Sequence, residues 1–478
     1  MNRVRTRFAP SPTGFMHIGN LRSGLYAYLF AKKNGGDFVL RIEDTDRTRY
    51  VEGAVETVYR TLKIAGIEHD EGPDKDKGYG PYIQSERMGL YKEYADLLVD
   101  RGAAYYCFCD EERLSTLKNA DGIKHYDGHC RDIPVEEARK RIAAGEPYVV
   151  RHKVPHTDGV GKYTDAVYGE ISVAYKEMDD IILLKSDGMP TYNFANVVDD
   201  HLMEISHVLR GCEYLSSTPQ YNLIYEGFGW ETPSYAHLPH IMKDAHHKLS
   251  KRNGDANFED FYSKGYLPEA IVNYIALLGW SPEGNEEKLS LKELEEQFTL
   301  ERINNSPAMF DNDKMKWLNG EYVKALSDEE FLSLATPWLE NSAAKKCNLE
   351  ELAKLLKTRV EILSEIPEKV AFLDDFDDFS LELFNNSKQK SSIEVAASTI
   401  GEIIDVFSST PCVSEDLFAA LVALSEKLAI KKNAILWVTR IALTGAQSTP
   451  GGATEMAVVL GKEESLRRLN KVRERLNV

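Results

Sequence analysis

Short apolar runs alternate with longer amphipathic segments over about the first 80 residues. A short strand is predicted at about Thr6, and it ends at Pro10 because proline cannot continue a sheet. Apolar residues recur at positions 21, 25, 28 and 29, which predicts a helix that ends at the glycine pair 35–36. A buried-type strand over 37–42 and a helix from about 50 to 65 follow. The alternation predicts an α/β fold with a parallel, Rossmann-like sheet covered by helices.

Residues from about 81 to 190 interrupt this alternation. They contain a predicted helix from Ser85 to Gly102, the run AYYCFCDEERL, a turn at YDGHCRD and a helix at PVEEARKRIAAG. Strand-like runs follow over 148–154 and 181–184. The parallel pattern returns at about residue 191, with a helix at ANVVDDHL, a strand at ISHVLRG and a helix over 217–228. We interpret 81–190 as an insertion between two halves of one nucleotide-binding fold.

The remaining chain is rich in helix signals. Helices such as 268–278 are predicted within 241–320, and strand signals nearly vanish after about 321. The predicted organisation is therefore a catalytic domain in two halves (1–80 and 191–240), an inserted domain (81–190), a helix-rich region (241–320) and two all-α domains (321–375 and 376–478).

Composition changes this picture little. The chain has 478 residues, 43% hydrophobic and 28% charged, as expected for an ordinary globular protein of several domains. No apolar run reaches the roughly 18 residues that cross a membrane, and MNRVRTRF lacks the apolar core of a signal peptide. These features favour a cytoplasmic location without membrane contact, and free thiols or a metal site for the six cysteines.

The charge distribution limits which surfaces can meet nucleic acid. The net charge of −18 argues against indiscriminate binding of nucleic acid. The last 18 residues, with six cations and three glutamates, form a basic segment of charge +3. We interpret this segment as a local face that can contact an RNA.

Two short segments carry candidate chemistry. The turn His17-Ile18-Gly19-Asn20 stands between a strand and a helix, where backbone N–H groups and the helix dipole favour an anion. Lys248-Leu249-Ser250-Lys251-Arg252 places three cations within five residues. Taken separately, the first can be an ordinary strand–helix corner with a capping histidine, and the second a solvated loop.

Taken together, HIGN and KLSKR resemble the two signatures of the class I aminoacyl-tRNA synthetases. RFAPSPTG, RIEDTD, EGP, QSER, LLKSDGMPTYNFANVVDDHLM, LRG and SSTPQ extend the resemblance to bacterial glutamyl-tRNA synthetases over essentially the whole chain. The resemblance implies an inserted domain that binds the acceptor end of a tRNA, a stem-contact region carrying KLSKR and an α-helical region that binds the anticodon. Asn20 stands at the fourth position of the first signature.

The resemblance also implies a glutamate pocket. A guanidinium recognises a carboxylate through two charge-assisted bonds, which the amide of glutamine cannot accept. Structural ion pairs are the alternative for these charged residues. The implied glutamate-binding residues are Arg7, Ala9, Ser11, Glu43, Tyr192, Asn196, Arg210 and Tyr214.

For the nucleotide, the implied chemistry has two steps: glutamate attacks the α-phosphate of ATP, and the glutamyl group then passes to the terminal adenosine of tRNA-Glu. His17, Gly19, Lys248 and Lys251 are the implied catalytic residues, and Mg²⁺ would screen the phosphates. The implied ATP-binding residues are Gly14, His17, Gly19, Asn20, Lys248, Ser250 and Lys251.

The third candidate site is a group of cysteines. Cys107 and Cys109 with Cys130 suit tetrahedral zinc, and relatives in the resembled family continue with a histidine two positions after the last cysteine. Here that position is Asp132, which we expect as the fourth ligand ahead of His129, with His125 and Tyr126 nearby. Three buried thiols without metal are the alternative.

Several alternatives stay open at this point. They are an adenylate-forming ligase that uses no tRNA, a truncated relative that glutamylates a tRNA base, a non-catalytic tRNA-binding paralogue and a glutaminyl enzyme. The helical last third and the intact HIGN and KLSKR segments argue against them. Arg359 in the helical region is the implied tRNA contact that bears on rejection of tRNA-Gln, and we expect a monomer.

Overall fold

The computed structural model describes residues 3–46, 51–117, 125–250, 256–374 and 376–478. The chain forms two compact units. The first comprises Met1–Phe261 with Ile271–Asp311, and the second Tyr262–Ala270 with Asn312–Val478. Within the described ranges, no helix is long and apolar enough to cross a membrane.

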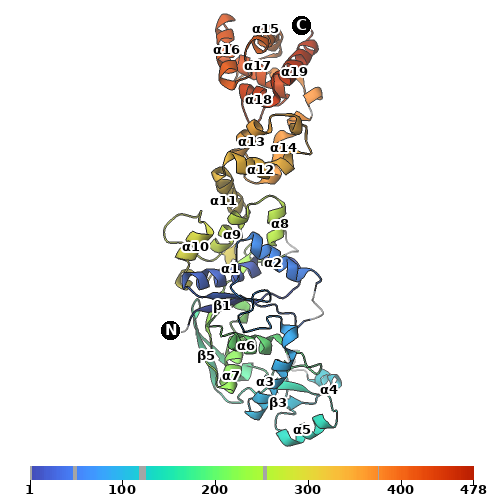
Figure 1. Ribbon diagram of the computed structural model, residues 1–478, viewed down its shortest axis with the longest axis vertical. Helices are drawn as coiled ribbons and strands as arrows, with labels where there is room; N and C mark the ends of the chain where they lie inside the picture. The colour runs from blue at the N-terminus through green and yellow to red at the C-terminus, as the bar shows by residue number, and fades with distance from the viewer. Residues whose placement is uncertain (1–2, 47–50, 118–124, 251–255, 375) are drawn as a thin grey trace. The chain divides into compact units, whose positions relative to one another are not determined.

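The first strand–helix–strand segment of unit 1 follows the sequence pattern closely. Strands β1 (Arg5–Phe8) and β2 (Asp37–Leu40) pair in parallel, and helix α1 (Ile18–Lys33) lies against them (Figure 1). A Cβ on Gly24 of α1 would lie 2.9 Å from the ring of Phe8, so glycine permits this close packing. This packing holds the carboxyl end of β1 beside the start of α1.

A four-stranded sheet completes the catalytic half of unit 1. Its order is β6-β5-β9-β8, with β5 antiparallel to β6 and parallel to β9, and β8 parallel to β9. Strand β8 also lies beside β1, since the amide of Ser206 donates to the carbonyl of Arg5 over 2.9 Å. The strands are β5 (Val160–Asp165), β6 (Gly169–Ala174), β8 (His207–Gly211) and β9 (Ser234–Leu238).

Part of the expected insertion extends this sheet. Strands β5 and β6 fall within 81–190, and the whole range belongs to unit 1. The rest of it forms an antiparallel sheet of order β3-β4-β7, which shares an apolar core with helices of residues 192–228. Its elements are α3 (Met88–Asp100), β3 (Ala104–Cys107), α4 (Glu111–Thr116), α5 (Val135–Ala143), β4 (Val149–His152) and β7 (Ile182–Leu184).

Other elements complete unit 1. Helix α2 begins at Ala54, later than expected. Helices α8 and α9 run across the division between the two units. These elements are α2 (Ala54–Ile64), α6 (Tyr192–Leu202), α7 (Thr218–Phe228), β10 (Ile241–Met242), α8 (Phe258–Ser263), α9 (Pro268–Leu277), α10 (Leu291–Gln297) and β11 (Ala308–Met309).

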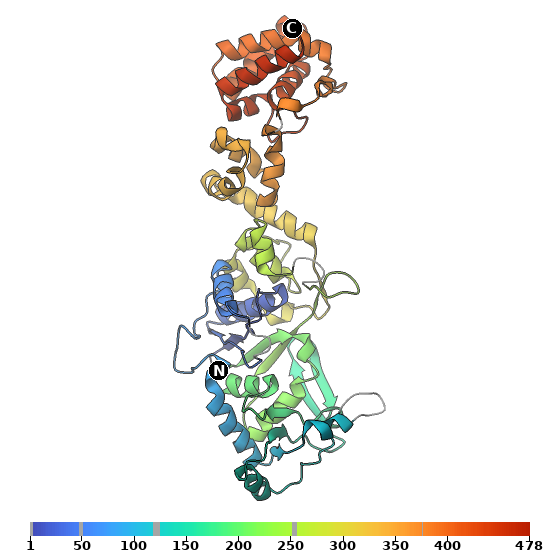
Figure 2. The same ribbon diagram turned by 90° about the vertical axis from the view of Figure 1, so that its right-hand side faces the viewer.

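Unit 2 is helical in its described part, as the sequence predicts. Figure 2 shows the orange and red helices of the last third packed side by side. One apolar core runs from Leu267 to Val472, so the expected division at 375 does not separate two cores. The helices are α11 (Asn312–Ala325), α12 (Asp328–Leu339), α13 (Leu349–Lys357), α14 (Ile366–Val370), α15 (Ile393–Ser409), α16 (Ser414–Lys427), α17 (Lys432–Thr444), α18 (Ala453–Leu460) and α19 (Lys462–Arg475).

The basic segment at the end of the chain is helix α19, and most of its cations form ion pairs or hydrogen bonds within unit 2. Arg468 is buried and donates to Glu464 and to the carbonyl of Leu443. Lys471 pairs with Asp377 at 2.6 Å. Lys462, Arg467 and Arg475 also bond within the unit. This helix stabilises the fold, and it presents far less unpaired charge than its composition indicates.

Candidate active site

The first site element is the start of α1. His17 is the N-cap, and its Nδ1 accepts the Gly19 amide at 3.0 Å. A neutral ring therefore carries its proton on Nε2, as a donor. The side chain lies at a helix N-terminus that favours anions, so His17 is oriented to donate to a phosphate oxygen.

Tertiary contacts bring the second signature to this turn. The amide of Ile18 donates to the carbonyl of Ala256 over 2.8 Å, and the amide of Phe258 donates to the carbonyl of Met16 over 3.0 Å. The chain that follows KLSKR is thus bonded directly to HIGN. Lys248 is exposed and lines a cavity beside this turn, whereas Lys251 lies outside the described residues.

A cavity of about 790 Å³ opens at the carboxyl ends of β1 and β8. This volume lies within the range typical of small-molecule sites. Eleven of the residues expected to bind glutamate or ATP line it: Arg7, Ala9, Ser11, His17, Gly19, Asn20, Glu43, Tyr192, Arg210, Tyr214 and Lys248.

Three expected residues lie behind or beside this cavity. Asn196 is buried on α6 and donates from Nδ2 to the carbonyl of Tyr192 over 2.7 Å, so it supports the tyrosine. Gly14 has φ of +111°, a conformation suited to glycine, and shapes the turn before α1. Ser250 is half-buried beyond Leu249.

One end of the cavity, where glutamate is expected to bind, is a buried network of charges. Arg7 donates from Nε to the two carboxylate oxygens of Asp200, over 3.1 and 3.3 Å. Arg41 donates to the same carboxylate over 2.7 Å and to Glu43 over 2.9 Å.

Ionisation in this network follows from burial and pairing. Burial acts to raise the pKa of Asp200, but Arg7 and Arg41 outweigh it and lower the pKa. Burial raises the pKa of Glu43, and Arg41 and Arg7 oppose this shift.

The buried charges in this part of the cavity are paired unevenly. Arg7 and Arg41 bond directly to Asp200, and Arg41 also faces Glu43 and Asp199. Arg210 bonds directly to His237 and Thr218 instead of a carboxylate.

Arg210 lies at the end of β8 among aromatic rings. Its guanidinium carbon is 5.0 Å from the ring centre of Tyr214 and 4.9 Å from that of Tyr221. The rings of Tyr192 and Tyr214 lie 5.3 Å apart. The ring faces of these tyrosines hold the guanidinium of Arg210. Within the described part of the chain, no carboxylate forms an ion pair with it.

Several wall residues were not expected from the sequence. Arg22, Glu213 and His240 line the same cavity. Arg22 lies three residues after Gly19 on α1 and so on the same helix face, which could have indicated it from the HIGN segment. Asp200 within ANVVDDHL gave no comparable signal, because its partner Arg7 is 193 residues away along the chain.

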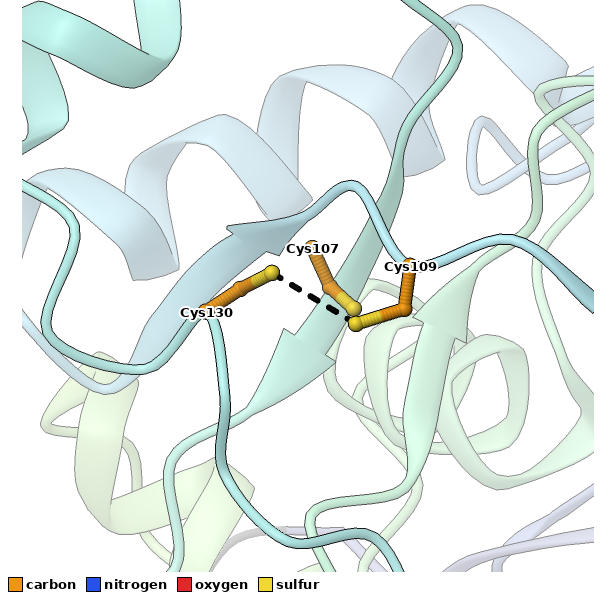
Figure 3. Close-up of side chains that lie close together, drawn as sticks. All are labelled: Cys107, Cys109 and Cys130. Carbon is orange, nitrogen blue, oxygen red and sulfur yellow. Dashed lines mark hydrogen bonds between the residues drawn. The ribbon is translucent and has the colours of Figure 1, made fainter. Parts of the chain in front are cut away.

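The cysteines come together at the end of β3 (Figure 3). Their Sγ atoms lie within 4.8 Å of one another, and those of Cys109 and Cys130 are 3.6 Å apart. A tetrahedral zinc with Zn–S bonds of about 2.3 Å places sulfur atoms about 3.8 Å apart. The three thiols therefore have the spacing of a zinc site and could hold zinc.

The hydroxyl oxygen of Tyr126 is a fourth potential ligand atom beside the three thiols. Its hydroxyl lies 3.2 Å from the Sγ of Cys107 and 3.5 Å from that of Cys109. Asp132, the expected ligand, is exposed and does not belong to the group. The chain makes a turn at Cys130, where the amide of Ile133 bonds back to its carbonyl, and Asp132 on this turn points to solvent. The expectation of Asp132 is therefore corrected.

Unit 2 has a cavity of its own, of about 580 Å³. Arg359, the expected tRNA contact, is exposed on its wall. The remaining wall residues are Thr358, Glu368, Lys369, Phe372, Ser448, Thr449 and Pro450. A cation beside hydroxyl groups and one aromatic ring offers both ionic and stacking contacts to a nucleotide.

Known proteins match both units. The family described as tRNA synthetases class I (E and Q), catalytic domain, matches residues 3–317, and the anticodon binding domain family matches 330–473. The chain is 53% identical over 473 residues to a glutamate–tRNA ligase of Clostridium botulinum (strain Hall), covering 98% of this chain and 97% of the relative. A glutamate–tRNA ligase of Clostridium kluyveri is 52% identical with the same coverage.

Solved structures agree with these matches. The crystal structure of a glutamate tRNA ligase from Elizabethkingia meningosepticum in complex with its amino acid superposes with a TM-score of 0.89 and 34% sequence identity. The superposition covers 99% of this chain and 100% of that one. The glutamyl-tRNA synthetase of Elizabethkingia anophelis gives a TM-score of 0.88. The chain belongs to the family of class I tRNA synthetases (E and Q).

Proposed function

We propose that this protein is a glutamate–tRNA ligase, which activates L-glutamate with ATP and transfers it to the terminal adenosine of tRNA-Glu. The observation that carries the proposal is that two guanidinium groups, those of Arg7 and Arg210, and the carboxylate of Glu43 line one cavity, with Arg210 bonded directly to His237 and Thr218 rather than to a carboxylate. Glutamate has two carboxylates and one ammonium, which match these two cations and this one anion.

The same charge count discriminates against glutamine. A glutamine zwitterion is neutral overall and would leave one buried guanidinium without a counter-ion, which costs far more than the loss of a neutral hydrogen bond. This argument also disfavours the glutaminyl alternative. In the proposed pose Arg7 and Arg210 contact carboxylate oxygens of the substrate, and Glu43 accepts from its ammonium group.

In the first step, an α-carboxylate oxygen of glutamate attacks the α-phosphorus of ATP. The bond from that phosphorus to the bridging oxygen breaks, and pyrophosphate leaves. His17 donates from Nε2 to a phosphate oxygen, and Lys248 stabilises the charge that develops on the leaving group. Mg²⁺ bound to ATP would screen the charge of its phosphates. We propose the same stabilising role for Lys251.

In the second step, a ribose hydroxyl of the terminal adenosine attacks the carbonyl carbon of glutamyl-adenylate, and AMP leaves with the bonding electrons. The protein supplies no covalent nucleophile, so its contribution is orientation and electrostatic stabilisation. We propose that the part of unit 1 built on β3-β4-β7 binds the acceptor end of the tRNA, that 241–311 contacts its stem and that unit 2 binds its anticodon. We also retain the expectation of a monomer.

We propose a structural zinc held by Cys107, Cys109 and Cys130, with the phenol oxygen of Tyr126 completing the set. The Sγ spacing and the position of the Tyr126 hydroxyl support this arrangement. When bound, zinc would tie the end of β3 to the turn at Cys130. The site is structural and takes no part in the transfer of glutamate.

Aminoacylation tests the proposed function directly. Purified protein is given ATP with glutamate or glutamine, and pure tRNA-Glu or tRNA-Gln. We expect glutamylation of tRNA-Glu, none with glutamine, and loss of activity in His17→Ala. ATP–pyrophosphate exchange should be nearly silent until tRNA-Glu is added, because we expect tRNA to complete the site. Robust exchange without tRNA would instead favour an adenylate-forming ligase.

A further inference from the structure

Two arginines of the glutamate pocket are held by partners of different charge. Arg7 is bonded through Nε to the carboxylate of Asp200. Arg210 is bonded through Nε to His237 over 3.2 Å and through Nη2 to the hydroxyl of Thr218 over 2.6 Å. Both partners of Arg210 are neutral acceptors when His237 is unprotonated, so they orient the guanidinium without cancelling its charge.

The tautomer of His237 follows from the groups on either side of its ring. Nδ1 lies 2.6 Å from a carboxylate oxygen of Asp165, which can only accept, so Nδ1 carries the proton. Nε2 then presents its lone pair to the Nε–H of Arg210; the Thr218 hydroxyl also lies 3.2 Å from Nε2 but donates over 2.8 Å to the carbonyl of Tyr214. A proton on Nε2 would point at the Nε–H of Arg210 and leave that donor without an acceptor, so this tautomer is disfavoured. Burial lowers the pKa of His237, and although Asp165 opposes this effect, the net direction keeps the ring neutral.

Asp165 is itself fixed by the chain around it. It is buried at the end of β5, beside Tyr235 of β9, and accepts the amides of Val167, Tyr168 and His237 over 2.9, 3.0 and 3.1 Å. His237 is fully buried on β9, one strand away from Arg210 on β8. The chain Asp165–His237–Arg210 therefore crosses three neighbouring strands and ends at the cavity.

We propose that His237, oriented by Asp165, is a positioning residue that aims Arg210 at a carboxylate of the amino-acid substrate while placing no carboxylate in direct contact with Arg210. This inference rests on the proposed function, since it requires Arg210 to bind glutamate. It adds two residues, neither of which lines the cavity, to the determinants of amino-acid affinity.

Two substitutions of His237 separate orientation from packing. The amide of His237→Asn lies near the Nδ1 position and can still donate to Asp165, but it offers no acceptor to Arg210. The amide oxygen of His237→Gln can reach the Nε2 position and accept from Arg210. We expect His237→Asn to raise the KM for glutamate roughly 10- to 100-fold, the effect of losing a hydrogen bond to a charged group. His237→Gln should restore it to within about 3-fold of wild type.

The KM values for glutamate and ATP, together with one control variant, show whether the effect is specific to the amino acid. The KM for ATP should change by less than about 3-fold in both variants, because Arg210 acts on the amino acid. His207→Asn alters another histidine, the first residue of β8, whose ring lies 4.9 Å from that of Phe30 in a tilted contact, and should leave the KM for glutamate unchanged. Equal losses in His237→Asn and His237→Gln would show a packing role and overturn the proposal, as would an unchanged KM in His237→Asn.

Arg210→Ala distinguishes failure of this inference from failure of the proposed function. If Arg210→Ala leaves the KM for glutamate unchanged, the pocket assignment fails. If it raises the KM while His237→Asn does not, only the positioning role fails. Should the His237 variants not fold, nitrogen-15 NMR of histidine in the wild-type protein decides: we expect His237 neutral and protonated on Nδ1, and a proton on Nε2 would overturn the proposal.

Discussion

At the scale of single residues, the site depends on charges that are buried and paired unevenly. Arg7 and Arg41 share the carboxylate of Asp200, and Arg41 also holds Glu43. Burial strengthens every one of these interactions because water is absent, and it makes an unpaired group costly. Substitutions here should therefore act strongly on substrate binding.

Removal of Arg7 tests the recognition of glutamate. Arg7→Ala should lower kcat/KM for glutamate roughly 100- to 10,000-fold, because a desolvated carboxylate loses its charged partner. The KM for ATP should stay nearly constant in steady-state charging assays. Arg3→Ala is the matched control, since Arg3 is exposed and pairs with Asp37 outside the cavity. Glutamate charging within a few fold of wild type would refute the assignment of Arg7.

His152 should make unit 1 sensitive to acid. Burial lowers the pKa of His152 to about 4, against an ordinary value of 6.5. Between these values the unfolded chain binds the proton and the folded chain does not, so the free energy of unfolding falls as the pH decreases from 6.5 to 4. At higher pH both states are neutral, and the full stability is present.

Urea denaturation at pH 7 and pH 5 measures this effect. His152→Leu removes the titration, so its loss of unfolding free energy between the two pH values should be smaller than that of wild type by about 2 kcal/mol. His156→Leu, an exposed histidine nearby in the chain, should lose as much as wild type. An identical loss in His152→Leu and wild type would contradict the prediction.

At the scale of elements, sheet pairing and turns decide which side chains meet. The turn at Cys130 directs Asp132 to solvent, while the loop before it brings the Tyr126 hydroxyl to the thiols at the end of β3. The guanidinium of Arg151 on β4 lies 3.9 Å from the ring centre of Tyr126 and holds the ring in place. The turn thus brings the oxygen of Tyr126 to the thiols, whereas the spacing along the sequence indicates Asp132.

Metal analysis of protein purified without chelator or His-tag tests this donor set. We expect about one zinc per chain in the wild type and less than about 0.2 in Cys107→Ser. Tyr126→Phe should weaken retention of zinc against a competing chelator, whereas Asp132→Asn should not. Zinc released by Asp132→Asn and kept by Tyr126→Phe would reinstate the carboxylate, and a wild type without zinc would leave three buried thiols.

At the scale of the whole molecule, each of the two compact units has a cavity of its own. Unit 1 contains the cavity proposed to bind the amino acid and the nucleotide, and unit 2 has one with Arg359 on its wall. Changes in unit 2 should therefore alter the choice of tRNA and leave the affinity for glutamate unchanged.

Arg359→Gln tests this division. We expect it to reduce the preference for tRNA-Glu over tRNA-Gln by roughly 10-fold, the effect of one lost charged contact, with an unchanged KM for glutamate. Lys354→Ala on α13 is a suitable control, because Lys354 is exposed and pairs with Glu351. A change in glutamate KM, or an unaltered tRNA preference, would argue against the role of Arg359.

The sequence by itself determined the local elements and the residues that end them. The HIGN turn, the capped helix α1, β2 and the helices of the last third follow from capping, apolar periodicity and turn residues, which act within a few positions of the chain. The residues at the ends of these elements, such as His17, Gly19 and Glu43, line the cavity as expected, whereas Lys248 reaches it through tertiary contacts.

Only the tertiary structure decided the partners. Asp200 reaches Arg7 across 193 residues and Asp165 reaches His237 across 72, and no local pattern encodes such pairs. The same holds for the Tyr126 hydroxyl beside the thiols, for β5 joining the catalytic sheet, and for the cations of α19 that bond inside unit 2. A side chain's charge can be read from the sequence. Whether a neighbouring group neutralises that charge, or the charge remains available to a substrate, depends on which distant groups the packed core brings within hydrogen-bond distance.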